Sequence, residues 1–162
     1  MKFKEIRVGI ADLNVGENPD QLITVGLGSC VGIVIYDGYK KIGGLAHIML
    51  PDSTQFLNVT NEMKFANLAI PILIDKLIYK GAIKRNLKAK IAGGASMFNF
   101  ADKSMIMDIG NRNCIAVKKT LKESGIPIIS EDIGGNKGRT VTFDTSNGLF
   151  KIRTVGVGVK EI

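Results

Sequence analysis

The sequence predicts a single α+β domain over residues 1–162, with layered mixed or antiparallel β-sheets flanked by two main helices. Short stretches rich in β-branched residues, typical of strands, recur along the chain. Two longer stretches place apolar residues at helical spacing. The chain has 162 residues, of which 45% are hydrophobic, and this length and composition suit one domain with one core.

The first segments of the chain are expected to be short strands separated by a loop. Residues 6–10 form a strand candidate. A polar loop is predicted over residues 14–20, where Gly16 and Pro19 interrupt the pattern. Residues 21–25 are β-prone and lead into a glycine-rich turn.

A β-hairpin is predicted after that turn. Residues 30–36 are rich in β-branched residues and read as a buried strand. A turn signal follows at residues 37–40, and residues 41–50 form the returning strand, which Pro51 ends.

The register of this hairpin decides whether the one histidine of the chain reaches a cysteine. If the turn is centred between Gly38 and Tyr39, Cys30 and His47 lie directly opposite each other. Directly opposite residues share one face of a sheet, with Cβ atoms roughly 4.5–5.5 Å apart. A bulge at Gly43-Gly44 would shift the register by one residue and turn His47 to the other face.

The first of the two helices is expected from about residue 60 to residue 80. Apolar residues recur there at helical spacing, Thr60 is a candidate N-cap and Gly81 a candidate residue after the end. Pro71 lies inside this stretch and predicts a kink or break near residues 69–70.

The second helix is expected over about residues 112–124. Asn111 is its candidate cap, and Gly125 and Pro127 end it. Cys114 falls inside this helical pattern and fits the usual role of a lone cysteine, a small buried hydrophobic residue.

The remaining strands are predicted from short β-prone stretches and one hairpin signal. The dipeptide Asn147-Gly148 strongly favours a tight hairpin turn. The strand candidates are residues 87–92, 126–130, 140–143 and 149–155.

The formal net charge of the chain is +7, carried mainly by scattered lysines. No arginine-rich run and no nucleic-acid-binding signature accompanies it, so nucleic acid is not expected as a partner. A solvated lysine-rich surface explains most charge of this kind. If the charge has a function, an acidic protein surface suits it best.

The chain is expected to work in the cytoplasm without inserting into a membrane. No apolar run reaches the ~18 residues that a membrane helix needs. Residues 1–7 contain an acid and no apolar stretch, unlike a signal peptide. Two cysteines make no disulfide framework, which favours a reducing compartment.

The main candidate for chemistry is the stretch Gly-Leu-Gly-Ser-Cys at residues 26–30. A cysteine with a histidine in reach can become a thiolate nucleophile. The turn before Cys30 could aim the backbone N–H groups of Gly28 and Ser29 at an oxyanion, as acyl transfer requires. The alternative for Cys30 is a buried structural role.

His47 is the candidate base, because imidazole can take a proton from a thiol and return it to a leaving group. The alternative is a hydrogen-bonded histidine in the core. A Cys-His pair usually needs a third group that holds the imidazole tautomer. The hydroxyl of Thr24 could accept from the ring, although a strand threonine is commonly present for its β-propensity.

No metal or organic cofactor is expected. One histidine and two distant cysteines without a Cys-x-x-Cys motif are a poor ligand set for zinc. The glycine pairs Gly93-Gly94 and Gly134-Gly135 match no nucleotide-binding pattern. They are predicted to be turns, and either could border the site.

The chain resembles the CheD family of bacterial chemoreceptor glutamine deamidases. Matching motifs occur in the same order over nearly the whole chain: Gly26-Leu27-Gly28-Ser29-Cys30-Val31, Gly44-Leu45-Ala46-His47-Ile48-Met49-Leu50-Pro51, Ala89-Lys90-Ile91 with Gly93-Gly94-Ala95 and Met97-Phe98, Ile109-Gly110 with Arg112-Asn113, and Asp132-Ile133-Gly134-Gly135 with Gly138-Arg139.

The resemblance implies a function and a set of roles. Cys30 would be the nucleophile, His47 the base and Thr24 the third member of a triad, on a layered fold similar to bacterial deamidating toxins. The implied substrates are glutamines on the cytoplasmic helical bundle of chemoreceptors. Many members of the family also bind CheC, a phosphatase of the response regulator CheY.

The sequence therefore predicts a cysteine-dependent protein-glutamine deamidase that acts in chemotaxis adaptation. One alternative is a regulatory binding partner of CheC in which deamidation is secondary. A second alternative is a cysteine peptidase that uses the same nucleophile. Phe98 and Phe100 are candidate residues of a partner surface.

Overall fold

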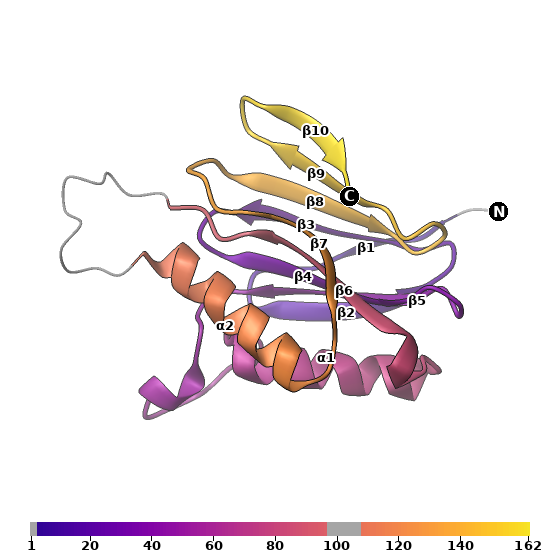
Figure 1. Cartoon of the computed structure of the whole chain (residues 1–162), viewed down its shortest axis with the longest axis horizontal. Coiled ribbons are helices and arrows are strands. Elements are labelled where there is room, and N and C mark those ends of the chain that lie inside the picture. Colours follow the sequence, from indigo (N-terminus) through magenta and orange to yellow (C-terminus); the bar gives the residue numbers. More distant parts are fainter. Residues whose placement is uncertain (1–2, 97–107) are drawn as a thin grey trace.

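The computed structural model describes residues 3–96 and 108–162, which form three layers (Figure 1). Two five-stranded sheets stack face to face, and two helices cover the far face of one of them. Both sheets contain parallel and antiparallel pairs. The predicted α+β class, with mixed sheets and two main helices, is confirmed.

The sheet without helices, called here the outer sheet, has the strand order β1-β3-β8-β9-β10. β1 and β3 are parallel, and the other neighbours are antiparallel. The bounds are β1 Glu5–Arg7, β3 Gln21–Leu27, β8 Arg139–Asp144, β9 Phe150–Thr154 and β10 Gly158–Glu161.

The sheet between the outer sheet and the helices, called here the central sheet, has the order β2-β5-β4-β6-β7. Only β6 and β7 pair in parallel among its described strands. The bounds are β2 Asp12–Glu17, β5 Ile42–Ile48, β4 Val31–Asp37, β6 Leu87–Gly93 and β7 Ile128–Ile133.

The helices lie on the central sheet, α1 over β5 and β2 and α2 over β4 and β7 (Figure 1). None of the described helices is both long and apolar enough to cross a membrane. The bounds are α1 Ala66–Lys80 and α2 Ile109–Glu123, with short 3-10 turns at Ser53–Gln55, Glu62–Lys64 and Lys84–Asn86.

The middle strand of the central sheet, β4, is buried on both faces. Ile33 and Ile35 belong to the hydrophobic cluster beneath the helices, whereas Val34 belongs to the cluster between the two sheets. Successive side chains of a strand point to opposite faces, so β4 supplies both cores. This double burial explains why its sequence is a continuous apolar run.

Helix α1 differs from the prediction at its start and at its proline. It begins at Ala66, after the separate turn Glu62–Lys64, and Thr60 does not cap it. The helix runs continuously through Pro71, whose side chain is exposed and whose nitrogen cannot donate a helical hydrogen bond. The end at Gly81, with φ 120°, is as predicted.

The polar loop predicted over residues 14–20 is wrong, because most of it belongs to β2. Leu13 and Val15 pack against the cluster beneath the helices, while Asn14 points away. Alternation of this kind marks a strand covered on one face. The exposed edge strand β10 was not predicted, since no side chain on it is buried.

The second helix and the later strands lie close to their predicted places. Helix α2 begins earlier than expected, and Asp108, not Asn111, caps it. Cys114 is buried as predicted. β7 ends three residues after its predicted limit of 130, and the turn at Asn147-Gly148 joins β8 to β9 as expected.

The register of the hairpin of β4 and β5 differs from the prediction. His47 pairs with Gly32, not with Cys30. The connection is not a two-residue turn, because Asp37 and Ile42 are the last paired residues and residues 38–41 form the loop. The Asp37 carboxylate accepts hydrogen bonds from two N–H groups of that loop, both at 3.0 Å, which stabilises the longer turn.

This shift leaves His47 on the face where the prediction placed it. The side-chain period of a strand is two, so a shift by two residues preserves the face and a shift by one reverses it. Gly43-Gly44 carries no bulge. A Cβ at Gly44 would lie 2.5 Å from Leu73 Cδ1, and one at Gly43 would lie 2.8 Å from Phe143 Cε2. The two glycines therefore let β5 pack closely on both of its faces.

Candidate functional site

The site begins where the two sheets face each other near β3 and β5. Thr24, on β3 of the outer sheet, places its Oγ1 2.7 Å from Nδ1 of His47, on β5 of the central sheet. Both side chains are buried. Residues far apart in the chain thus form a direct contact across the layers of the sandwich.

The hydroxyl of Thr24 fixes the tautomer of His47. The Thr24 O–H donates to the carbonyl oxygen of Val8 at 2.7 Å, so towards the ring the same oxygen can only accept. Nδ1 of His47 therefore carries the ring proton, and Nε2 is left with a free lone pair. Nε2 is buried and has no hydrogen-bond partner among the described residues.

Cys30 lies on the same side of the central sheet as His47. It directly precedes β4 and packs against the cluster between the sheets. His47 pairs with Gly32, so Cys30, two residues before Gly32, is the next residue of that segment on the same face, and a diagonal neighbour of this kind lies roughly 7–8 Å away. Gly32 has no side chain, and the space above it is occupied by Leu27, whose Cδ1 would lie 3.1 Å from a Cβ at that position. Cys30 is half-buried.

Burial sets the protonation states of both groups. It lowers the pKa of His47 from 6.5 to about 4, so the ring is neutral near pH 7. Burial also raises the pKa of the Cys30 thiol, although a hydrogen bond from its own backbone N–H acts in the opposite direction. Near pH 7 the site therefore holds a neutral thiol and a neutral imidazole.

The turn before Cys30 is held through its carbonyl groups. Ala95 N–H donates to the Gly28 oxygen at 2.9 Å, and Gly94 N–H donates to the Cys30 oxygen at 2.8 Å. Between them, the Ser29 oxygen accepts at 2.9 Å from the side-chain amide of Asn113 on α2. Three successive carbonyl groups are thus held by hydrogen bonds.

The N–H groups of the same turn differ in their availability. Gly28 N–H was predicted to bind the oxyanion. In the structure it already donates to the Gly26 oxygen at 3.1 Å, so it is not free to do so. Ser29 and Cys30 N–H have no carbonyl acceptor among the described residues. Gly26 takes a φ of 76°, which glycine adopts without strain, and lies where the register of β3 shifts.

Of the two glycine pairs noted in the sequence, Gly93-Gly94 contacts this turn and Gly134-Gly135 contacts residues next to it. Gly94 bonds to Cys30 as described, and Gly134 N–H donates to the Gly93 oxygen at 2.9 Å. A Cβ on Gly93 would lie 2.3 Å from the Cys30 oxygen, so no side chain fits there. The pairs were predicted to be turns, but Gly93 is the last residue of β6 and Gly134-Gly135 directly follow β7, so both pairs lie at strand ends.

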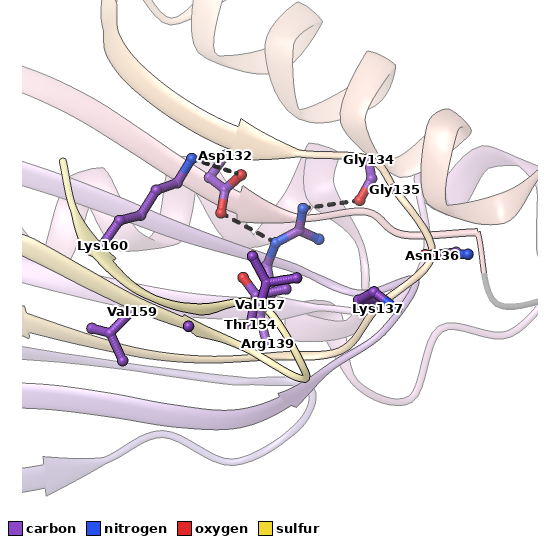
Figure 2. Close-up of a pocket in the computed structure, with 11 residues that line it drawn as sticks. Asp132, Gly134, Gly135, Asn136, Lys137, Arg139, Thr154, Val157, Val159 and Lys160 are labelled. Atoms are coloured by element: carbon purple, nitrogen blue, oxygen red, sulfur yellow. Dashed lines mark hydrogen bonds and ion pairs between the residues drawn. The ribbon is translucent and has the colours of Figure 1, made fainter.

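The buried residue Arg139 binds the two strand ends that carry these glycine pairs. Figure 2 shows the Arg139 guanidinium directed at Asp132 and Gly134, beside a cavity of about 360 Å³. Its donors reach the Gly134 oxygen at 2.9 Å, the Gly93 oxygen at 3.3 Å and the Asp132 carboxylate at 3.4 Å. Arg139 thereby links the ends of β6, β7 and β8. Of these strands, β6 is the one whose end contacts Cys30.

Sequence reasoning did not assign roles to Asn113 and Arg139. A signal existed for Asn113, because it occupies the buried face of α2 together with Cys114 and Val117. A polar residue at a core-facing helical position is uncommon unless it is hydrogen-bonded. No comparable periodic signal marks Arg139, whose partners come from loops that only the fold brings together.

We expect the Thr24→Val substitution to lower kcat for amide hydrolysis at this site by about 10- to 100-fold, because the ring loses the acceptor that holds its tautomer. Valine keeps the shape of threonine and removes only the hydroxyl. Thr24→Ser, which retains the hydroxyl, is the matched control and should stay near the wild-type rate. An unchanged kcat in Thr24→Val would exclude this role.

Comparisons with known proteins give a consistent result. The family model described as "CheD chemotactic sensory transduction" matches residues 49–154. A Clostridium botulinum (strain Hall) protein called "Probable chemoreceptor glutamine deamidase CheD" is 72% identical over 162 residues, which is 100% of both chains. A protein of the same name from Clostridium novyi (strain NT) is 71% identical over the same 162 residues, again 100% of both chains.

One solved structure resembles the chain more distantly. It is the hypothetical protein YfiH of Bacillus licheniformis, which matches with a TM-score of 0.48 at 16% sequence identity. The match covers 75% of this chain and 50% of that chain.

Proposed function

The chain belongs to the CheD family, and from this premise we propose that it converts chemoreceptor glutamines to glutamates with Cys30 as nucleophile, His47 as base and Thr24 as the group that orients the base. The observation that carries the assignment is the pairing of Thr24 with His47. It leaves Nε2 of the ring buried, unprotonated and without a partner among the described residues, on the face that Cys30 shares.

The first half of the reaction forms a thioester and releases ammonia. Nε2 of His47 takes the proton of the Cys30 thiol, and the sulfur attacks the carboxamide carbon of a substrate glutamine. The carbonyl oxygen becomes an oxyanion, which the N–H groups of Ser29 and Cys30 stabilise. His47 then gives its proton to the departing amine as the C–N bond breaks.

The second half of the reaction returns the enzyme to its resting state. His47 takes a proton from water as the water oxygen attacks the thioester carbon. The C–S bond breaks, the sulfur takes the proton back, and glutamate is released. The protons delivered to ammonia and to the sulfur both pass through His47, and the new carboxylic acid loses its proton to solvent. This route uses no metal or organic cofactor. The product carries a new negative charge, and a positively charged enzyme suits such a surface.

A chemoreceptor cytoplasmic fragment is the substrate that tests this function. The wild-type protein should release ammonia, and mass spectrometry should show glutamines changed to glutamates in equal number. A cysteine peptidase would cut the fragment, so intact chains with altered glutamines separate the two reactions. A fragment that is neither altered nor cut would contradict the proposal.

Two finer features belong to the same proposal, a cytoplasmic location and a partnership with CheC. Their support is the resemblance of the motifs to the family, whose members often bind CheC. Phe98 and Phe100, the candidate partner residues, lie outside the described residues. Measuring CheC phosphatase activity with wild-type protein and with Cys30→Ala separates binding from catalysis, because a binding role should survive the substitution.

A further inference from the structure

One side chain outside the triad bridges the two segments that carry the cysteine and the histidine. Asn113, on α2, is fully buried. Its amide nitrogen donates to the Ser29 oxygen at 2.9 Å and to the Met49 oxygen at 3.0 Å. Ser29 precedes Cys30, and Met49 follows the strand of His47. Both hydrogens of one amide are therefore used on the site.

The amide oxygen of Asn113 is the part of this side chain that destabilises the fold. Oδ1 of Asn113 is buried and has no hydrogen-bond partner among the described residues. A buried polar atom without a partner destabilises the folded state. The neighbours of Asn113 along the buried face of α2 include Cys114 and Val117, which belong to the hydrophobic cluster. The two donated hydrogen bonds are what an apolar residue could not supply.

The bond to Ser29 has a geometric consequence for catalysis. The Ser29 carbonyl and the Cys30 N–H belong to one peptide group, which is planar, and the one cis bond among the described residues is elsewhere, at Asn18-Pro19. In a trans peptide the C=O and N–H bonds point in opposite directions. Holding the Ser29 oxygen on the side of α2 therefore aims the Cys30 N–H away from α2.

The neighbouring carbonyl groups do not depend on a side chain. Those of Gly28 and Cys30 are held by backbone N–H groups of residues 94–95. Among the described residues, Asn113 alone supplies a side-chain bond to the three carbonyl groups of the turn. The Ser29–Cys30 peptide is thus the one whose orientation a single substitution can release.

From these contacts we infer that Asn113 is a positioning residue, which fixes the plane of the Ser29–Cys30 peptide and so aims the Cys30 N–H at the oxyanion. The inference rests on the proposed function, since it assigns the donor of that reaction. Both amide hydrogens of Asn113 are used by the Ser29 and Met49 carbonyl groups, so it acts through the peptide and not on the thiol itself. Its effect should appear in kcat rather than in KM, because the oxyanion exists only along the reaction path.

The test is Asn113→Leu, which keeps the branched shape and removes both donors without leaving a charge. We expect kcat for deamidation of the receptor fragment to fall by about 10- to 100-fold with little change in KM. Alkylation of Cys30 by iodoacetamide, followed by mass spectrometry of its peptide, forms no oxyanion. Its rate should stay within about threefold of the wild-type rate if the sulfur and His47 keep their places.

Matched variants separate positioning from stability. Val117→Ala lies one turn along the same buried helix face and should lower the melting temperature while keeping kcat. Asn113→Ala is the second variant if Asn113→Leu does not fold, and its kcat should fall as well. An unchanged kcat in a folded Asn113 variant, or a parallel loss of kcat and alkylation, would overturn the inference. A wild-type protein without deamidase activity would instead overturn the proposed function.

Discussion

Cys30→Ala is expected to abolish ammonia release from a chemoreceptor fragment, with a loss in kcat on the order of 10⁴-fold or more. Without the sulfur no thioester forms, and the remaining groups of the site offer only hydrogen bonds to the amide. Cys30 is half-buried, so alanine removes little packing and the fold should persist. The measurement is ammonia release together with mass spectrometry of the fragment.

The second cysteine provides a matched control for this experiment. Cys114 is buried on α2 within the cluster beneath the helices, where its environment raises the thiol pKa, chiefly through burial. Cys114→Ala should lose some stability through the small cavity but keep kcat within about threefold of the wild-type value. Deamidation that survives in Cys30→Ala and disappears in Cys114→Ala would reverse the assignment of the nucleophile.

His47→Gln is expected to lower kcat by about 10²- to 10⁴-fold at pH 7, because no other group described in the site can take the thiol proton. The pH profile gives the sharper result. In the wild-type protein the base must be unprotonated, and its pKa is lowered to about 4 by burial. Activity should therefore hold from neutral pH down to mildly acidic pH and be lost as pH falls through about 4.

The pH dependence of kcat in His47→Gln should differ from that of the wild-type protein in shape as well as in the size of kcat. Without a base the reaction needs a thiolate that forms by itself, and burial raises the pKa of that thiol. The remaining rate should rise with pH into the alkaline range, with no acid limb near pH 4. A variant that keeps the acid limb of the wild-type protein would show that another group is the base.

The candidate residues of the site could be chosen from the sequence, for a local reason. Cys30 directly precedes β4 and His47 lies on the adjacent strand β5, and ordered motifs along the chain favoured a glutamine deamidase, which the family membership confirms. The reactive residue types are also few, with one histidine and two cysteines in the chain. Because reactive residues are few and Cys30 and His47 are close in the chain, few catalytic pairs had to be considered.

The register of the hairpin was not predictable in the same way. The number of loop residues depends on Asp37, whose carboxylate also accepts from Ile83 N–H at 2.9 Å, beyond the hairpin. These hydrogen bonds keep the pKa of Asp37 below its usual value although burial acts to raise it. The contact between Asp37 and Ile83, which are far apart in the chain, thus favours the four-residue loop at residues 38–41. A rule that considers only the residues of the turn does not include this contact.

By itself, the sequence determined the α+β class, the two helices, the glycine turn and the residue types that we propose carry the chemistry. Periodicity and residue chemistry are local properties, so they can be read without a fold. Only the tertiary structure decided that Thr24 meets His47 across two sheets, that Gly28 N–H is already occupied and that Asn113 holds the Ser29 carbonyl. Those contacts join residues from separate elements, and their existence depends on how the layers stack rather than on any pattern along the chain.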